Sequence, residues 1–155
     1  MAGTQTPRPE MKHEAMSETG VVDLLRDHHL RPTRQRVALA EMLFSHGHRH
    51  ISAEALHEEA DGLNIKVSLA TIYNTLHQFT NAGLLRAVPV DGSKTYFDTN
   101  VANHHHFFVE DDQMVIDIPA QTFSVGMLPE PPEGMEITRV EVVVRVRRKS
   151  GFKAR

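Results

Sequence analysis

Three adjacent histidines followed by two phenylalanines, His104-His105-His106-Phe107-Phe108, form the stretch with the most distinctive chemistry in the chain. In a strand, side chains alternate between the two faces, so His104 and His106 would point to one side and His105 to the other. Two neutral imidazoles on one face can share a zinc, iron, copper or nickel ion, and an imidazole can also be an axial ligand of haem iron. The run therefore indicates a metal or haem site, with a polar loop as the alternative.

Composition limits the ways in which such a site can be built. The chain has 155 residues, enough for one domain or two small ones, and no cysteine, so any metal must be held by nitrogen and oxygen ligands. The formal charge of -3 argues against a uniformly basic nucleic-acid binder but leaves room for a local basic face. No apolar run approaches the roughly 18 residues of a membrane span, and the N-terminus lacks the apolar core of a secretory signal. We therefore expect a cytoplasmic protein with no membrane partner.

Helical periodicity and capping residues predict a helical first half, after a polar, flexible tail that ends near Glu18. The expected helices cover about residues 21–30, 34–45, 53–60 and 69–81, and the last three have suitable N-caps at Thr33, Ser52 and Ser68. A strand at 84–90, the turn Asp91-Gly92 and a returning strand at 94–98 then predict a hairpin. Helices followed by a hairpin are typical of a winged helix, and a plain helical core with a surface hairpin is the alternative.

In a winged helix, the last helix before the hairpin enters the major groove of DNA. Here that helix has an uncharged polar face, and residues 62–90 contain no acidic residue, so this surface could approach phosphate. The candidate DNA-binding residues of the helix and its cap are Ser68, Thr71, Tyr73, Asn74 and Gln78, and the candidate phosphate contacts are Arg31, Arg34, Arg36 and Lys94.

Beyond Asn100 the pattern changes to strands at about 104–109, 114–118 and 137–147, and prolines between them allow at most one short helix. Three strands in roughly 50 residues make a poor core alone, so we expect a second copy of the chain to complete it. Packing against its own N-terminal domain is the alternative. The predicted fold class is therefore α+β. The basic residues near the C-terminus are interpreted as solubilising, with a contact to DNA as the alternative.

Five ordered motifs resemble the ferric uptake regulator (Fur) family: Leu30-Arg31-Pro32-Thr33-Arg34-Gln35-Arg36, His50-Ile51-Ser52-Ala53-Glu54, Ser68-Leu69-Ala70-Thr71-Ile72-Tyr73, Phe79-Thr80-Asn81-Ala82-Gly83-Leu84 and the histidine run. The resemblance implies an N-terminal winged-helix DNA-binding domain followed by a small α/β dimerisation domain. We place the flexible tail at 1–18, the winged helix at 19–99, a hinge at 100–103, the dimerisation and sensing domain at 104–150 and a basic tail at 151–155.

The resemblance also implies roles for particular residues. The regulatory metal site of the family maps onto His50, Asp98, His104, His106 and Asp117. Tyr73 and its neighbours would read bases. The family usually has arginine after this tyrosine, and Asn74 stands there instead, so the operator is expected to favour adenine where arginine would favour guanine.

Several departures from the family pattern refine this interpretation. Val109 and Asp112 stand where many relatives carry Cys-x-x-Cys, so no cysteine-ligated zinc is expected, and Arg139-Val140-Glu141 replaces a usual histidine on the last strand. The triple histidine, the absent cysteines and Asn74 resemble the iron response regulator (Irr) branch, whose members are haem-responsive.

This resemblance implies a homodimeric repressor of iron and haem metabolism genes, which releases double-stranded operator DNA when haem binds through His104, His105 or His106. The first alternative is a repressor that senses divalent manganese, iron or zinc. A metallohydrolase is the distant alternative, since it would need a substrate cleft at the metal.

Overall fold

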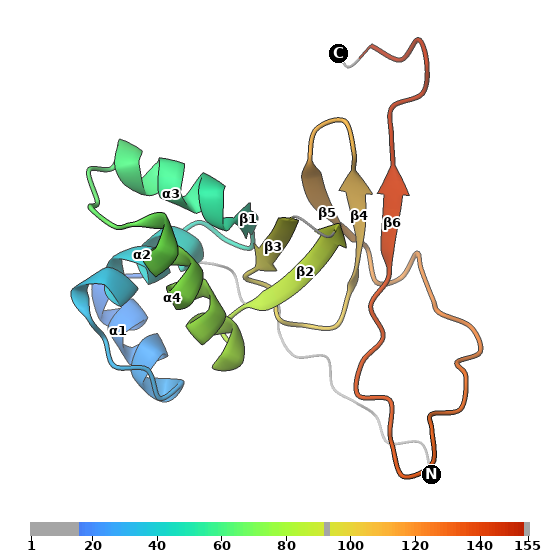
Figure 1. Cartoon of the computed structure of the whole chain (residues 1–155), viewed down its shortest axis with the longest axis horizontal. Coiled ribbons are helices and arrows are strands. Elements are labelled where there is room, and N and C mark those ends of the chain that lie inside the picture. Colours follow the sequence, from blue (N-terminus) through green and yellow to red (C-terminus); the bar gives the residue numbers. More distant parts are fainter. Residues whose placement is uncertain (1–15, 92–93, 154–155) are drawn as a thin grey trace.

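The computed structural model describes residues 16–91 and 94–153 (Figure 1). Helices come first in the chain: α1 (Glu18–Asp27), α2 (Arg34–Phe44), α3 (Ala53–Gly62) and α4 (Leu69–Asn81). Each follows a serine or threonine whose hydroxyl accepts a hydrogen bond from the backbone N–H three residues later, namely Ser17, Thr33, Ser52 and Ser68. The predicted caps of α2, α3 and α4 are confirmed.

The first helix lies about three residues earlier than its periodicity predicts. Ser17 caps it, so α1 begins at Glu18, and it ends at Asp27 because His29 adopts a left-handed backbone conformation, with φ of 59°. Residues 1–15 of the predicted tail lie outside the described residues.

The first sheet forms the wing, with strand order β1-β3-β2 and antiparallel pairing throughout. Strands β2 (Arg86–Asp91) and β3 (Lys94–Asp98) are the predicted hairpin, and its turn at residues 92–93 lies outside the described residues. Strand β1 (His50–Ser52) was not predicted from the sequence. Three residues are too few to show a period of two, so this strand is defined by its pairing with β3 rather than by its own pattern.

The second sheet has the order β5-β4-β6, built from β4 (His105–Val109), β5 (Met114–Ile118) and β6 (Val143–Val146). Strand β6 runs parallel to β4, so the chain needs a crossover, which the long segment from 119 to 142 supplies (Figure 1). The predicted strand at 137–147 is wrong in length. Its ladder with β4 is only four residues long, because the Val142 N–H is bonded to the His105 ring instead of to a neighbouring strand.

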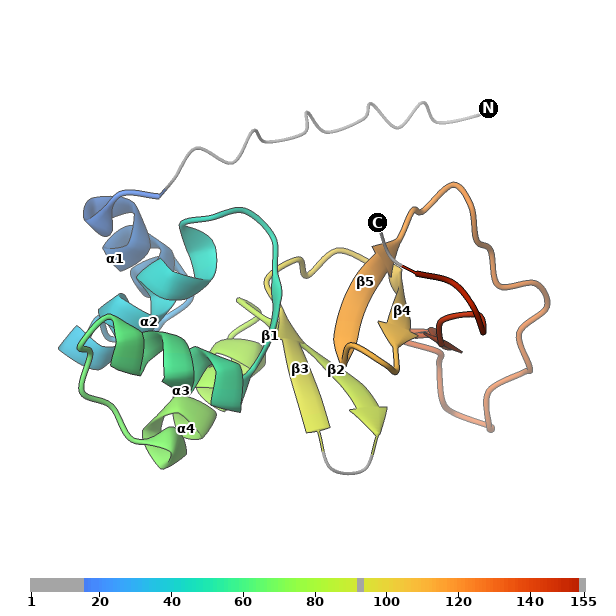
Figure 2. The same ribbon diagram turned by 90° about the horizontal axis from the view of Figure 1, so that it is seen from above.

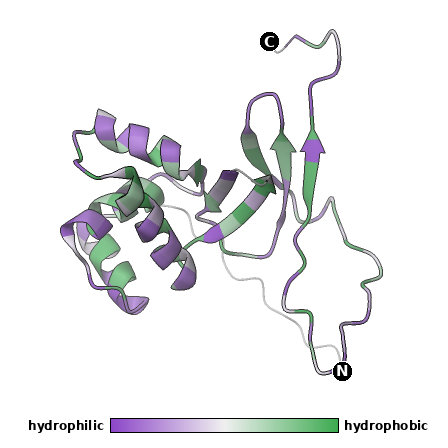
Figure 3. Cartoon of the chain, viewed as in Figure 1, coloured by the Kyte–Doolittle hydropathy of each residue, from purple (hydrophilic) through white to green (hydrophobic). Residues whose placement is uncertain are grey.

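The first sheet lies between the helices and the second sheet (Figures 1 and 2). One apolar core fills the space between the helices and the wing. A second, smaller core joins the two sheets, with Val88, Val90 and Tyr96 from the wing packed against Phe108 and Val115. Hydrophobic residues dominate β4 and β6 (Figure 3). The predicted α+β class, with a winged helix followed by a small second unit, is confirmed.

Within residues 16–91 and 94–153, no helix combines the length and the hydropathy needed to cross a membrane.

Candidate metal centre and nucleic-acid interface

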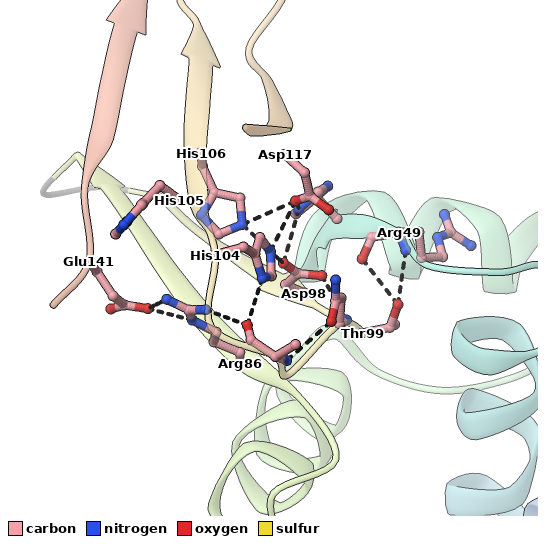
Figure 4. Close-up of polar contacts among 12 residues, drawn as sticks. Arg49, Arg86, Asp98, Thr99, His104, His105, His106, Asp117 and Glu141 are labelled. Atoms are coloured by element: carbon pink, nitrogen blue, oxygen red, sulfur yellow. Dashed lines mark hydrogen bonds and ion pairs between the residues drawn. The ribbon is translucent and has the colours of Figure 1, made fainter. Parts of the chain in front are cut away.

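Five side chains meet where the two sheets face each other, and we call them the cation cluster: His50, Asp98, His104, His106 and Asp117. Figure 4 labels all of them except His50. The register of the strands explains the meeting. His50 on β1 is paired with Asp98 on β3, while His106 on β4 is paired with Asp117 on β5. One cross-strand pair from each sheet, together with His104 immediately before β4, therefore contributes to one centre. One ligand atom from each of the five lies within 4.8 Å of all the others.

All three histidines of the cluster direct Nε2 toward the same two carboxylate oxygens. His50 Nε2 lies 3.1 Å from Asp98 Oδ2 and 2.8 Å from Asp117 Oδ1. The same two distances are 2.8 and 3.0 Å for His104, and 3.0 and 3.3 Å for His106. The histidines of the cluster are largely buried, with no side chain more than 14% exposed, whereas the Asp117 side chain is 39% exposed.

Neighbouring backbone groups orient two members of the cluster. His104 Nδ1 lies 2.6 Å from the Ala102 carbonyl oxygen, which can only accept, so this nitrogen carries the proton and Nε2 keeps its lone pair in the neutral ring. The Asn100 N–H donates to Asp98 Oδ1 at 2.8 Å, which leaves Oδ2 for the centre. Both side chains thus present a lone pair to the centre.

Two buried atoms of the cluster have no hydrogen-bond partner among the described residues: His50 Nε2 and Asp117 Oδ1. They lie only 2.8 Å apart, yet their directions do not make a hydrogen bond. Buried polar atoms are normally paired, so such a pair of orphaned atoms needs an explanation. A shared cation fits, because three imidazole nitrogens and two carboxylate oxygens form a mixed ligand set suited to manganese, iron or zinc.

Burial and neighbouring charges act in opposite directions on the pKa values of His50 and Asp98. Burial alone would lower the pKa of His50, but the nearby Asp98 and Asp117 carboxylates raise it above the ordinary 6.5. Burial alone would raise the pKa of Asp98, but contacts with the histidines and a backbone N–H hold it well below its ordinary value. The carboxylate of Asp98 therefore stays ionised and attracts positive charge, whether a proton or a metal ion.

The third residue of the triple histidine lies on the other side of β4. His105 Nδ1 accepts the Val142 N–H at 3.1 Å, and its ring packs edge-on against Phe123 with centroids 4.9 Å apart. The ring borders a cavity of about 250 Å³. The alternation of faces inferred from the sequence is observed, and it separates His105 from His104 and His106.

The candidate DNA-binding residues lie on α4 and around the start of α2. Ser68, Asn74 and Gln78 are exposed, and Thr71 and Tyr73 are half-buried. Arg36 joins the two helices, because its guanidinium donates to Gln78 Oε1 at 2.8 Å and to the Arg31 carbonyl at 2.9 Å. Arg31 and Arg34 are exposed, and Lys94 begins β3 on the wing.

Three residues in charged contacts were not predicted from the sequence. Arg86 on β2 is buried and pairs with Glu141, and it also donates to the Ala102 carbonyl at 2.9 Å (Figure 4). Glu54 on α3 accepts the hydroxyl of Tyr73. A single charged residue beside a strand or helix carries no periodic signal that names its distant partner, so only the fold could identify these pairs.

The residues near the C-terminus contact the acidic turn between β4 and β5. Arg145 pairs with Glu110 and Arg148 pairs with Asp112, each at 2.7 Å. Asp112 is one of the two positions at which the resemblance to the Fur family would place a cysteine, and here it forms an ion pair instead. The interpretation of this basic end as simply solubilising was incomplete, because it missed these ion pairs.

A sequence profile of the Ferric uptake regulator family matches residues 27–142, which is most of the chain. The chain belongs to the Ferric uptake regulator family. It is 34% identical over 85 residues to a ferric uptake regulation protein of Vibrio cholerae serotype O1, covering 55% of this chain and 57% of that protein. It is 31% identical over 93 residues to the peroxide-responsive repressor PerR of Staphylococcus saprophyticus, covering 60% of this chain and 62% of that protein.

The chain spans less than two thirds of the length of these two relatives. Solved structures of the family match a larger part of the chain. The structure of the ferric uptake regulator from Pseudomonas aeruginosa with manganese has a TM-score of 0.63 and 28% identity, and the match covers 83% of this chain and 98% of that one. The Vibrio cholerae regulator, with a TM-score of 0.64 and 24% identity, has the same fold.

Proposed function

We propose that the chain is a metal-responsive transcriptional repressor that binds operator DNA as a homodimer. The observation that carries this proposal is the position of the cation cluster. His50 and Asp98 belong to the wing, whereas His104, His106 and Asp117 belong to the second sheet or its start. A ligand that contacts both units stabilises one relative orientation over others, and only such differential affinity can shift a conformational equilibrium.

The chemistry of the cluster supports a divalent cation as the effector. A bound Mn²⁺, Fe²⁺ or Zn²⁺ would supply positive charge between the two carboxylates. Asp98 is fully buried and ionised, and the cluster histidines offer nitrogen lone pairs toward it. A related structure of 28% identity was solved with manganese, which is consistent with this class of effector.

The partners follow from two surfaces. We assign base reading to the exposed polar face of α4 around Tyr73 and Asn74, and phosphate contacts to Arg31, Arg34, Arg36 and Lys94. The second sheet supports a second copy as the other partner. Met127, Met135 and Ile137 of the long crossover segment are exposed in the single chain, and a second copy could cover them.

Haem responsiveness, as in the Irr branch, is the second candidate, and it depends on His105. This ring lies apart from the cluster and borders a cavity next to Phe123. However, its Nδ1 accepts the Val142 N–H, so Nε2 carries the proton in the neutral ring and is a donor. Ligation of iron through Nε2 would require losing that hydrogen bond. His104 and His106 are nearly closed to solvent, and the Nε2 atoms of both face the carboxylates of the cluster.

A metallohydrolase is not supported by this geometry. Catalysis at a metal needs a coordination position open to substrate, and the histidine side chains of the cluster are almost fully buried.

The test uses a duplex enriched by the full-length chain from randomised DNA, with binding followed by fluorescence anisotropy. Mn²⁺ is expected to tighten wild-type binding by about 5- to 150-fold. His104→Ala should lose this response, and His105→Ala is the matched control that should keep it. A metal response that persists in His104→Ala contradicts the proposal. Release of DNA by hemin in wild type, but not in His105→Ala, would favour the haem reading.

A further inference from the structure

The side chain of Tyr73, on the helix assigned to base reading, is held by a residue of another helix. Its hydroxyl donates a hydrogen bond to Glu54 Oε1, and Glu54 lies in the first turn of α3. The contact joins residues 19 positions apart in the sequence. No other described hydrogen bond fixes this hydroxyl.

The ring of Tyr73 is restrained along one face as well. It stacks on the His77 ring one turn along α4, with centroids 6.5 Å apart and planes at 22°. His77 in turn meets Phe97 of β3 edge-on at 5.8 Å. The phenol is thus fixed at its hydroxyl by α3 and on one side by a ring that itself rests on the wing.

Glu54 is an unexpected residue at this place. A carboxylate repels phosphate, so an exposed one beside a DNA-reading helix weakens general attraction to DNA. The charge is nevertheless well supported where it stands. The hydrogen bond from Tyr73, together with the α3 backbone and Lys94, lowers the pKa of Glu54, and the same bond raises the pKa of Tyr73. The pair is therefore a charge-assisted hydrogen bond at neutral pH.

We propose that Glu54 is a positioning residue that sets sequence discrimination by fixing the Tyr73 ring. Its acceptor occupies the hydroxyl, so Tyr73 presents its ring rather than its hydroxyl to DNA. Its charge lowers affinity for any DNA, while its hydrogen bond preserves the geometry needed for the preferred sequence. The inference rests on the proposed function, because it requires that α4 reads bases.

These two effects can be separated by substitution. In the presence of Mn²⁺, the affinity of the full-length chain is measured for its enriched duplex and for a scrambled duplex. We define the specificity ratio as the affinity for the enriched duplex divided by the affinity for the scrambled duplex. Glu54→Ala should bind scrambled DNA more tightly and enriched DNA more weakly. The ratio should fall about tenfold, as expected for the loss of one charge-assisted hydrogen bond. Glu54→Gln removes the charge but keeps an acceptor oxygen, so it should retain most of the ratio.

A double-mutant cycle and a matched control variant test whether Glu54 acts through Tyr73. Tyr73→Phe should lower the ratio to a similar extent, and adding Glu54→Ala to it should cause little further loss. Glu58→Ala removes the same charge from an exposed position one turn along α3 and should leave the ratio unchanged. The inference is overturned if Glu54→Ala keeps the wild-type ratio or behaves like Glu58→Ala.

A measurement without DNA keeps this outcome distinct from a failure of the proposed function. The chain has two tyrosines, so Tyr73 can be assigned by NMR with Tyr96→Phe as reference. Glu54→Ala should bring the raised pKa of Tyr73 back toward its ordinary value and increase ring motion, and Glu58→Ala should do neither. An unchanged Tyr73 in Glu54→Ala overturns the inference. Failure of wild type to enrich any sequence would overturn the proposed function instead, and the NMR result would still decide whether Glu54 positions Tyr73.

Discussion

The winged-helix unit and the second sheet are held together by different forces. The helices enclose a core whose central side chains, including Leu39, Leu56 and Phe79, are completely buried. In the second sheet, Phe108 and Val115 are buried mainly by packing against the wing, and the long crossover segment leaves Met127 fully exposed. The first unit is therefore stabilised by its own apolar core, whereas the second depends on its neighbours.

This difference explains why the boundary between the units is suited to regulation. Metal-independent contacts cross it, including Arg86 with Glu141, Tyr96 with the Gln113 carbonyl at 2.6 Å, and Arg145 with the Val90 carbonyl. These contacts hold the second sheet near the wing without a large core. Elements of low local stability respond to small free energies, so the charge balance of the cation cluster can change their position.

The largest expected effect compares equivalent truncations in the two units. Phe79→Ala should lower the free energy of unfolding by about 3–5 kcal/mol, because it leaves a cavity in a closed core. Phe108→Ala should mainly loosen the second sheet and leave the helices folded. Urea titration by circular dichroism, combined with amide hydrogen exchange, distinguishes the two. Equal losses of helical stability would show that the units are not different in this way.

Cation binding should stabilise the second unit more than the first. At a free Mn²⁺ concentration of 100 times the dissociation constant, the chain should gain about 2.7 kcal/mol. Hydrogen exchange should slow most in β4 and β5. Asp98→Asn should abolish the gain, and Asp61→Asn, at an exposed acidic position on α3, is the control that should keep it. Protection confined to the helices would argue against a site between the units.

The buried Arg86 provides a test that needs no metal. Glu141→Gln leaves the guanidinium with the Ala102 carbonyl but without its carboxylate partner. Because Glu141 is about one-third exposed, solvent replaces part of the lost interaction, and a loss of about 1–2 kcal/mol is expected. Hydrogen exchange should speed up in β6 without a change in Mn²⁺ affinity. A large fall in Mn²⁺ affinity would mean that this contact supports the cation cluster itself.

The smallest effect concerns pH. The raised pKa of His50 contributes stability that is present below about pH 6.5 and is lost as the pH rises through the pKa of the folded chain. The lowered pKa of Asp98 contributes stability that is lost only in acid. The metal-free chain should therefore lose stability as the pH rises above about 6.5. With Mn²⁺ the trend should reverse, because a metal needs deprotonated imidazoles. Thermal melts with and without Mn²⁺ test both signs, and the same sign in both would contradict the account.

The fold could be predicted from the sequence wherever local patterns decide it. The caps at Thr33, Ser52 and Ser68 and the hairpin were predictable because each depends on neighbouring residues. Strand β1 was not, since its three residues are defined by pairing with β3. The extent of β6 was also not predictable, because a side chain of β4 takes the N–H that would extend its ladder.

The candidate site also has features that the sequence predicts and features that only the fold reveals. Its five residues were proposed through motifs of the family, and the fold brings all five together. Spacing in the sequence could not predict which histidine contacts which carboxylate. It also could not predict that the buried Nε2 of His50 and Oδ1 of Asp117 lack a hydrogen-bond partner among the described residues. The contacts of Glu54 with Tyr73 and of Arg86 with Glu141 had no local signal at all, since each joins elements that only the tertiary fold places side by side.

The most direct test of the central claim is pulsed EPR of Mn²⁺ bound to the full-length chain, which detects ¹⁴N nuclei of coordinating imidazoles. We expect a tightly bound ion with imidazole couplings that weaken in His50→Ala and in His104→Ala but remain in His105→Ala. A bound ion without imidazole couplings, or with couplings lost only in His105→Ala, would contradict the assignment of the cation cluster.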